Sequence, residues 1–398
     1  MNIKKVFRRK NLILIIGFLG LYLFATGLSF AFFSIAIKPE QTTTISGQKQ
    51  EELKKQGFLV DTTGPKTEIC PINGDKYTKA EKDAWQVRRP LLVMIENHED
   101  TRPQSGISRA DVVYEAVAEG GITRFMAVFF CDAQARESIL GPVRSVRTYF
   151  LDWASEYGKF PLYAHVGGAN TPGPANALGQ IEDYGWGGAT GNDLNQFAIG
   201  YPAFWRDYER MGRTVLTEHT MYSTTERLWG VGKARGWTDK SADGEEWQNY
   251  FDPWKFDYSN GSKGDVGKIS FGFWDNSPKY DVLWIYDTEN NLYQRNNGGQ
   301  PHKDLDYDQQ VTAKNVVVQF LKESNANDGY ENNLHLLYGT IGEGKALVFS
   351  NGKAIEAKWM KKTRLARTKF YDNSGEEIKF VPGKIWIEIL PVGNKVTY

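Results

Sequence analysis

The sequence predicts an α+β fold: a mixed α/β N-terminal ectodomain with a central sheet and flanking helices, then a smaller, mainly β C-terminal domain. One N-terminal transmembrane helix precedes both. Three observations predict this. An uncharged run of 26 residues lies near the N-terminus, strand-like runs mix with a helical pattern up to about residue 235, and the last 130 residues alternate apolar runs with turn signals. A chain of 398 residues also has room for about two domains.

The uncharged run extends from Leu12 to Ile37. As a helix it would be about 39 Å long, which exceeds the roughly 30 Å hydrocarbon core, whereas the apolar part of a cleaved signal peptide has only about 7 to 15 residues. Five basic residues precede the run, and no acidic residue occurs before Glu40. The positive-inside rule therefore predicts a cytoplasmic tail (1–11), a single-pass membrane anchor (12–37) and an extracytoplasmic remainder.

The formal net charge of zero conceals an uneven distribution. Removing the five basic residues of the tail from the total of 48 leaves 43 basic against 48 acidic residues after the anchor. A mildly acidic ectodomain disfavours a nucleic-acid partner, which requires a basic surface. The many aromatic residues, 12 Trp and 20 Tyr among them, suit sugars or other polar ligands.

Residues 38–87 are polar and weakly patterned, which predicts a stalk with a short ordered stretch near Cys70. Cys70 and Cys131 are the two cysteines of the chain. An extracytoplasmic location permits a disulfide between them, and two free buried thiols are the alternative. Their spacing does not predict a zinc site.

The N-terminal domain is expected to cover residues 88–235. The apolar run 90–97 is typical of a buried strand, and runs 111–119 and 122–130 on either side of a Gly-Gly pair predict a hairpin. A helix is expected to begin after Pro142, because apolar residues then recur at helical spacing.

The segment 236–268 is rich in Gly, Ser and Asp, which predicts a linker. The C-terminal domain (269–398) shows the turn signals NGK, NSGEE and PGK between strand-like runs. We therefore expect it to be mainly β.

Arg144 and Arg147 are three residues apart at the expected helix start. An arginine near the positive end of a helix dipole is unfavourable unless something negative binds there. The pair therefore indicates a site for phosphate, pyrophosphate or carboxylate. The alternative is structural ion pairs with Asp111, Glu115 or Asp152.

A wider polar cluster runs from Asn97 to Arg147 and includes Arg102. Within it, Glu115 and Glu119 share one strand face with Asp111, either as solvated charges or as partners of a cross-strand residue such as Arg124. His165 and His219 are each either structural or functional. No G-x-S-x-G, P-loop or H-E-x-x-H motif occurs, which argues against hydrolase, nucleotidase and zinc-protease readings.

Several long motifs then allow a family to be named. RPLLVMIENH, RPQSGISRADVVYEAVAEGGITRF, GPVRSVR, YAHVGGA and EHTMYS resemble the YerB-like lipoproteins, a bacterial cell-envelope family of unknown function with an N-terminal mixed domain and a smaller C-terminal domain. The resemblance spans about residues 88–235 and continues more weakly through KWMKKT and VPGKIWIEILP. No cysteine follows the apolar segment at a lipid-attachment position, so a transmembrane helix replaces the lipid anchor.

A fainter resemblance, by analogy, is to the LytR-CpsA-Psr envelope phosphotransferases. It implies that Asp111 binds Mg²⁺ and that Arg109, Arg144 and Arg147 hold a polyprenyl pyrophosphate. The acidic residue that this family places after its proline-arginine element is missing, because Ser145 follows Arg144.

The sequence thus predicts a membrane-anchored envelope protein that binds an anionic cell-wall polymer or a partner protein; the alternative is a phosphotransferase. No complete catalytic constellation can be named, and no cofactor is implied apart from Mg²⁺ under the alternative. The predicted anion-binding residues are Arg109, Arg124, Arg144, Ser145, Arg147 and His165, with Asp111 as metal ligand and Asn97, Arg102, Glu115, Glu119 and His219 as further polar residues.

Overall fold

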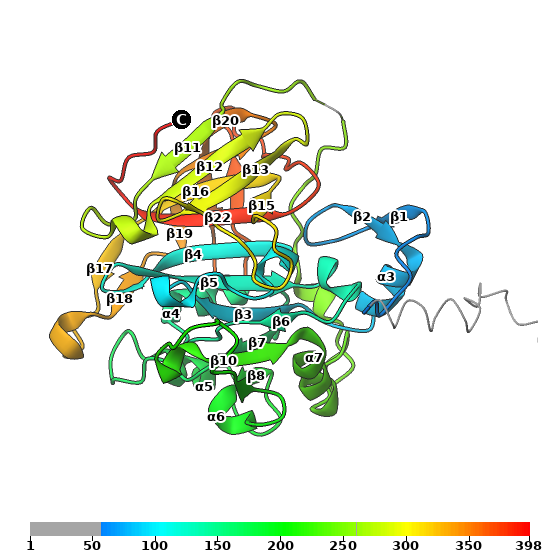
Figure 1. Cartoon of the computed structure of the whole chain (residues 1–398), viewed down its shortest axis with the longest axis vertical. Coiled ribbons are helices and arrows are strands. Elements are labelled where there is room, and N and C mark those ends of the chain that lie inside the picture. Colours follow the sequence, from blue (N-terminus) through cyan, green and yellow to red (C-terminus); the bar gives the residue numbers. More distant parts are fainter. Residues whose placement is uncertain (1–56, 260) are drawn as a thin grey trace, which may run out of the picture. The chain divides into compact units, whose positions relative to one another are not determined.

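A mixed sheet of ten strands joins the two halves of the chain (Figure 1). The computed structural model describes residues 57–259 and 261–398. The strand order in this sheet is β21-β20-β19-β16-β22-β4-β5-β3-β7-β8. The strands are β3 (Leu91–Glu96), β4 (Val112–Glu119), β5 (Ile122–Phe129), β7 (Leu162–His165), β8 (Asp193–Asn195), β16 (Asn315–Leu321), β19 (Gly342–Ser350), β20 (Lys353–Lys361), β21 (Lys369–Tyr371) and β22 (Ile385–Pro391).

The last strand of the chain connects the two halves of this sheet. β22 pairs in parallel with β16 on one side and with β4 on the other, where Ile385 lies opposite Val112 and Glu388 opposite Glu115. Residues 385–390 are all buried, as expected for a central parallel strand covered on both faces. The N-terminal and C-terminal domains therefore share one backbone hydrogen-bond network.

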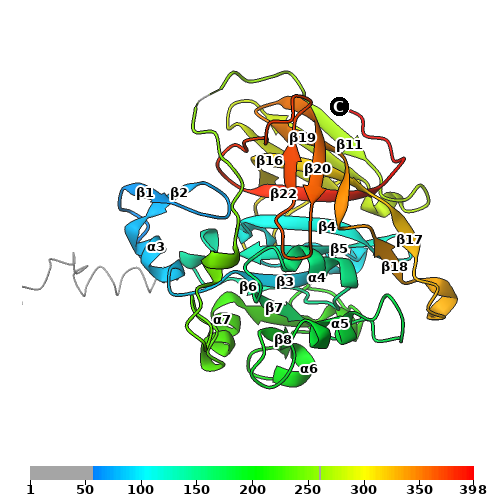
Figure 2. The ribbon, with the colours of Figure 1, turned by 180° about the vertical axis from the view of Figure 1, so that it is seen from behind.

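Helices cover both faces of the N-terminal half. On one face, Tyr114 of β4 stacks on Trp153 of α4 with ring centroids 5.7 Å apart. The register places Leu162 of β7 on the other face, where Gly232 of α7 leaves room for it, since a Cβ there would lie 2.6 Å from the leucine side chain. Figures 1 and 2 show α5, α6 and α7 beside β7 and β8. The α-helices are α3 (Lys79–Trp85), α4 (Thr148–Ala154), α5 (Ala177–Asp183), α6 (Gln196–Ile199) and α7 (Thr225–Ala234).

A second sheet packs on the face opposite α4, near the junction of the two domains. Trp284 of this sheet contacts Trp386 of β22 with ring centroids 5.4 Å apart. Residues alternate between faces along β4, so Glu115 points toward this sheet while Tyr114 points toward α4. The strands of the second sheet are β11 (Lys268–Phe271), β12 (Val282–Asp287), β13 (Leu292–Asn297), β14 (Gln300–Pro301) and β15 (Thr312–Ala313).

Smaller sheets and short 3₁₀ turns complete the described chain. The small sheets are formed by β1 (Lys66–Ile69) with β2 (Lys76–Thr78), by β6 (Ile139–Leu140), β10 (Met221–Thr224) and β9 (Trp205–Arg206), and by β17 (Glu323–Asn325) with β18 (Leu336–Tyr338). The 3₁₀ helices are η1 (Glu99–Thr101), η2 (Ile107–Arg109), η3 (Asp132–Gln134), η4 (Thr217–His219), η5 (Trp247–Tyr250), η6 (Pro278–Tyr280) and η7 (Glu331–Asn333).

The main elements predicted from the sequence are confirmed. The buried strand is β3, the hairpin is β4–β5, and the described residues from 269 onward form strands and 3₁₀ turns without an α-helix. The predicted anchor 12–37 lies outside the described residues. None of the helices in the described part of the chain is both long and apolar enough to cross a bilayer.

Two segments are more ordered than the sequence suggested. Residues 66–85 were expected to belong to the stalk but form β1, β2 and α3, and a capping box between Thr78 and Glu81 fixes the start of α3. In the segment 236–268, Trp247 and Trp254 are buried. Neither segment has a periodic apolar pattern, so the sequence did not predict its order. Single buried tryptophans hold one segment and a disulfide holds the other.

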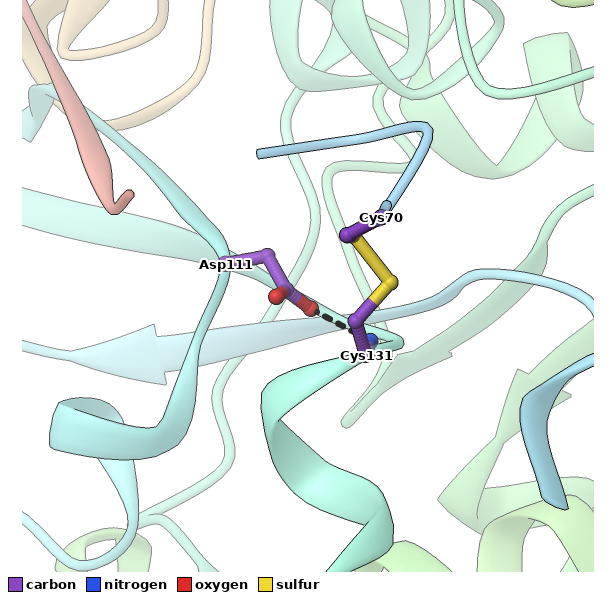
Figure 3. Close-up of side chains that lie close together, drawn as sticks. All are labelled: Cys70, Asp111 and Cys131. Atoms are coloured by element: carbon purple, nitrogen blue, oxygen red, sulfur yellow. Dashed lines mark hydrogen bonds between the residues drawn. A yellow bond between two sulfur atoms is a disulfide. The ribbon is translucent and has the colours of Figure 1, made fainter. Parts of the chain in front are cut away.

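The structure also decides the state of the two cysteines. Cys70 and Cys131 form a disulfide, which ties the β1–β2 segment to the end of β5 (Figure 3). The Asp111 carboxylate lies beside it and accepts backbone N–H groups from Phe130 at 2.7 Å and from Cys131 at 2.9 Å. The disulfide and the carboxylate therefore fix the same turn.

We expect loss of the disulfide to destabilise the protein strongly. The bond closes a loop with a sequence separation of 61 residues, and the loss of chain entropy in the unfolded state then accounts for about 4 kcal/mol. Urea unfolding of the full chain, followed by tryptophan fluorescence, should show this decrease for the double variant Cys70→Ala/Cys131→Ala. Reducing agent should lower the midpoint of the wild type but not that of the variant; equal midpoints for wild type and variant would contradict the prediction.

Candidate functional site

The carboxyl ends of three parallel strands, β3, β7 and β8, meet at one edge of the large sheet. This edge is where open α/β sheets commonly bind ligands. The loop 141–147 passes over it: the N–H of Arg144 donates to the carbonyl of Met94 at 2.9 Å, and the N–H of Val166 donates to the carbonyl of Arg144 at 3.1 Å. The backbone thereby fixes Arg144 between the ends of β3 and β7.

Glu96, the last residue of β3, holds two cationic side chains. Its Oε1 lies 3.1 Å from Nε of Arg144, and its Oε2 lies 2.9 Å from Nδ1 of His219. Glu96 and His219 are buried, whereas the Arg144 side chain is 27% exposed. We call these three residues the Glu96 cluster.

Both cations of the Glu96 cluster keep donors that the protein does not use. Within the described residues, no hydrogen bond involves the terminal nitrogens of Arg144 or Nε2 of His219. The carboxylate fixes one side of each group, so the other side is oriented but unpaired. A fixed guanidinium fork with free donors is the usual means of holding a carboxylate or a phosphate.

The same carboxylate changes the acidity of His219. The hydrogen bond that His219 donates to Glu96 raises the pKa of His219 above its ordinary value of 6.5, although burial and the nearby Arg144 charge lower it. His98 stacks on His219 with ring centroids 4.9 Å apart. The imidazolium form, which donates from both ring nitrogens, therefore persists to higher pH than in a free histidine.

A second set of charges lies next to the cluster. Glu119 pairs with Nη2 of Arg124 at 3.5 Å and with Nη2 of Arg147. Nε of both arginines and the buried hydroxyl of Tyr163 have no hydrogen-bond partner in the described chain. Three arginines thus share two carboxylates at this edge, which leaves an excess of positive charge.

The expected helix start after Pro142 is wrong. The helix α4 begins at Thr148, with Arg147 as its N-cap. Residues 143 and 146 instead form bridges with Ile95 and Gly168, which keeps the loop extended. The side chains of Arg144 and Arg147 therefore separate, one toward Glu96 and one toward Glu119, and none of the three carboxylates expected as partners pairs with them.

Ser145 and His165 contribute to the scaffold. The carbonyl of Ser145 accepts a hydrogen bond from Nη1 of Arg124 at 2.8 Å. His165 is fully buried, with Nδ1 2.7 Å from the carbonyl of Gly167 and Nε2 2.6 Å from Asp193. Both ring nitrogens of His165 are thus engaged, which leaves none to bind a ligand.

Asp111 and Arg109 lie at the opposite edge of the sheet. Val112, which follows Asp111, pairs with Val128 of β5, and Val128 pairs in turn with Leu92 at the amino end of β3. Arg124 of β5 pairs instead with Glu96, at the carboxyl end of β3. Arg109 pairs with Asp132 at 3.5 Å. The structure therefore does not bring Asp111 and Arg109 together with Arg144 and Arg147, as the phosphotransferase analogy requires.

The surroundings of Asp111 fit a structural carboxylate better than a metal ligand. Its oxygens accept hydrogen bonds from three backbone N–H groups and from Nδ2 of Asn73 at 2.6 Å. Burial raises its pKa to about 7, although the backbone donors lower it. Cys70 and Cys131 are the other potential ligands near it, but their sulfur atoms form the disulfide.

Glu115 belongs to a buried network at the junction of the domains. It forms an ion pair with Arg295 of β13 and accepts a hydrogen bond from Asn97 at 3.1 Å. Burial and the charge of Glu115 raise the pKa of Glu388 well above its ordinary range, which favours its protonated form. Arg102 donates from Nε to Oδ1 of Asn97 at 3.1 Å. Glu115 is thus not a solvated charge but part of the core.

One other group of potential metal ligands exists in the described chain. Ligand atoms of His98, Asp100 and His219 lie within 4.8 Å of one another. The two imidazole rings are stacked with an interplanar angle of 17°. Because a ring nitrogen binds a metal in the plane of its ring, two nearly parallel rings do not point at one ion, and this geometry does not favour a metal.

The sequence did not indicate Glu96 as a site residue, although it organises the cluster. Glu96 lies at the end of the apolar run that predicts a buried strand, so it was assigned to the strand. Its position at the carboxyl end of a buried strand was the signal that could have identified it. Its two partners come from loops about 50 and 120 residues away in the chain.

We expect Glu96→Gln to weaken the fold by about 1 to 3 kcal/mol, because the amide leaves two cationic donors without a charged acceptor. The pKa of His219 should fall toward 6.5. In the wild type, the raised pKa of His219 stabilises the fold below pH 6.5, and this stabilisation disappears as the pH rises through the pKa of the folded protein. The decrease in the free energy of unfolding caused by Glu96→Gln should therefore be larger at pH 6 than at pH 9. An NMR titration of the His219 ring with urea unfolding at both pH values checks this. The exposed Glu182→Gln is the control, and an unchanged pKa of His219 in Glu96→Gln would contradict the prediction.

Comparison with known proteins is consistent with this architecture. Two family models match the chain: "Protein of unknown function (DUF3048) N-terminal domain" over residues 77–238 and its C-terminal domain over residues 269–387. The Bacillus subtilis (strain 168) protein "Putative lipoprotein YerB" is 28% identical over 325 residues, which are 81% of this chain and 86% of that protein.

A solved structure is also similar. The crystal structure of YerB protein from Bacillus subtilis matches with a TM-score of 0.66 at 25% identity, and it covers 83% of this chain and 100% of that chain. None of these matches is to a LytR-CpsA-Psr phosphotransferase. The chain therefore belongs to the YerB family of two-domain proteins of unknown function.

Proposed function

We propose that this protein is a membrane-anchored, extracytoplasmic protein of the bacterial cell envelope that binds an anionic group of a cell-wall polymer or envelope partner at the Glu96 cluster. One observation carries the proposal: a single buried carboxylate orients Arg144 and His219 and leaves their outer donors unpaired. The group bound is a phosphate or a carboxylate, since either accepts from a guanidinium and an imidazolium together.

The local charge supports an anion in preference to a cation. Arg124, Arg144 and Arg147 share Glu96 and Glu119, and His219 adds a further charge when protonated. The chain after the anchor carries a net negative charge overall, so the attraction of an anion to this edge of the sheet is a local effect. A bound anion would balance the excess positive charge.

The envelope location is supported by three independent features. The uncharged run 12–37 with its basic tail predicts an anchor with the folded chain outside. The disulfide between Cys70 and Cys131 is typical of proteins in an oxidising compartment. The similar Bacillus subtilis protein is named a lipoprotein.

Binding is favoured over transfer chemistry. The alternative of a phosphotransferase needs a metal-binding carboxylate next to the arginines, and Asp111 lies at the other edge of the sheet. The nearest carboxylates, Glu96 and Glu119, are each occupied by two cations. The Glu96 cluster contains no serine, threonine or cysteine.

We expect Arg144→Ala to weaken binding of inorganic phosphate and sulfate at least tenfold, because a charge-assisted contact contributes about 1.5 to 3 kcal/mol. Isothermal titration calorimetry on the full chain in detergent measures this. Arg144→Lys should recover part of the affinity, since it restores the charge but not the fork. The control Arg136→Ala, in the loop after β5, should bind like the wild type; equal affinity in Arg144→Ala and wild type would overturn the proposal.

Sulfate affinity should also decrease as pH rises above about 6.5. The charged form of His219 donates to the anion and is lost as pH passes the raised pKa of this ring, whereas sulfate itself does not titrate there. Glu96, Glu218, Arg144, Asp100 and the stacked His98 are the titratable and charged groups around the ring. His219→Gln should bind sulfate more weakly and without this pH dependence. A retained pH dependence in that variant would assign the effect to another group.

A further inference from the structure

A cavity of about 410 Å³ lies where the loop after β3 meets the β13–β14 hairpin. We call it the junction pocket. Arg102 and Pro103 line it from the N-terminal domain, and Asn297, Pro301 and Lys303 line it from the C-terminal domain. Arg144 and His219 are not among its lining residues. It is therefore a separate site from the Glu96 cluster, formed by both domains.

Arg102 makes the pocket rigid. Its guanidinium donates to the carbonyl of Asn97 at 3.0 Å and to the carbonyl of Lys279 at 2.8 Å, which ties the domains together. The hairpin turn fits closely against it: Gly298 has a φ of +57°, and a Cβ there would lie 2.4 Å from the carbonyl oxygen of Lys279 and 2.9 Å from Nη1 of Arg102. A side chain at this position would not fit, so the wall of the pocket is set before any ligand arrives.

Asn297, which lines the pocket, carries a buried acceptor without a donor. Asn297 is 3% exposed, and its Nδ2 donates to Oδ1 of Asn97 at 2.7 Å, but its Oδ1 has no partner in the described chain. The neighbouring His302 does not supply one, because its ring nitrogens pair with Arg295 and Gln104. A buried acceptor left unpaired is unfavourable, so Asn297 points to a ligand that brings a donor such as a hydroxyl group.

Charge and shape narrow the ligand class further. Three cations, Arg102, Lys279 and Lys303, line the pocket. Lys279 pairs with Glu99 and Lys303 with Asp308, which leaves one positive charge in excess. Pro103 and Pro301 supply apolar wall on the two sides. A ligand that satisfies all three features carries hydroxyl donors, an acidic group and an apolar ring face, and the volume is that of a small-molecule site.

We propose that the junction pocket binds an acidic sugar unit. A hydroxyl group donates to Oδ1 of Asn297, the acidic group lies near Lys279 and Lys303, and the ring packs against the prolines. This proposal goes beyond the anion site at the Glu96 cluster, since the junction pocket would bind the hydroxyl groups and ring of a sugar as well as its charge. It also uses residues of both domains.

The test uses the full chain in detergent with the Arg144→Ala substitution, so that the Glu96 cluster does not contribute. Glucose 1-phosphate, glucose and inorganic phosphate are titrated separately by calorimetry. Glucose 1-phosphate should bind at least tenfold more tightly than either of the other two probes. Equal affinity for glucose 1-phosphate and phosphate would overturn the proposal, whatever the result at the Glu96 cluster.

Variants of the pocket locate the binding. Lys303→Ala and Gln300→Glu change exposed side chains that line the pocket, and each should weaken glucose 1-phosphate at least fivefold. The exposed Lys345→Ala is the control and should have no effect. Asn297→Leu should abolish the preference for glucose 1-phosphate over phosphate. If this variant does not fold, Lys303→Ala and Gln300→Glu still test whether glucose 1-phosphate binds in the junction pocket. Unchanged affinity in both surface variants would refute the site.

Discussion

The ion pair between Glu115 and Arg295 is the interaction on which the two-domain structure depends. Both side chains are fully buried, one on β4 of the N-terminal domain and the other on β13 of the C-terminal domain. A buried pair is more favourable when hydrogen bonds engage its other donors and acceptors. Here Thr123 and Asn97 donate to Glu115, and the Arg295 guanidinium lies 4.8 Å from the ring of Trp386, although its Nε has no hydrogen-bond partner in the described chain. Removing either charge would leave the other unpaired in the core, so the pair requires both domains to be in place.

This constraint explains why the two domains share one sheet. Glu388 of β22 lies opposite Glu115 and accepts a hydrogen bond from Trp284 of the second sheet at 3.0 Å. One arginine thus lies near two carboxyl groups, and the raised pKa of Glu388 favours a protonated form that reduces the repulsion between them. Strand β22, held between β4 and β16, carries this arrangement into the backbone. The junction pocket lies beside the network because Asn97 and Asn297 are hydrogen-bonded to each other.

The edge of the sheet with the Glu96 cluster is built differently, since it remains open to solvent. Glu96 is held by the buried strand β3, and its partners come from loops. The rigid element therefore carries the carboxylate, and the loops carry the donors that face outward. A site arranged in this way binds an anion without reorganising its own charges.

The extent to which the sequence predicts the structure differs from element to element. Strand β3 and the β4–β5 hairpin follow from local patterns, because an apolar run and a Gly-Gly turn suffice. The start of α4 does not, since bridges from Val143 and Val146 to distant strands override the helical spacing after Pro142. Glu119 was expected on the face of Glu115, but an irregularity between Val117 and Glu119 changes the register and lets it reach Arg147.

The sequence by itself determined the charged tail and uncharged run, the strand-rich composition and the arginines of the proposed anion-binding edge. These are properties of neighbouring residues, which periodicity and charge express directly. Only the tertiary structure decided the partners: that Glu96 holds Arg144 and His219, that Asp111 belongs to the disulfide turn, and that the two domains close a pocket around Asn297. Each of these pairs residues that are far apart in the chain, so no local pattern specifies them. Long-range strand pairing and the energetic need to satisfy buried charges select them.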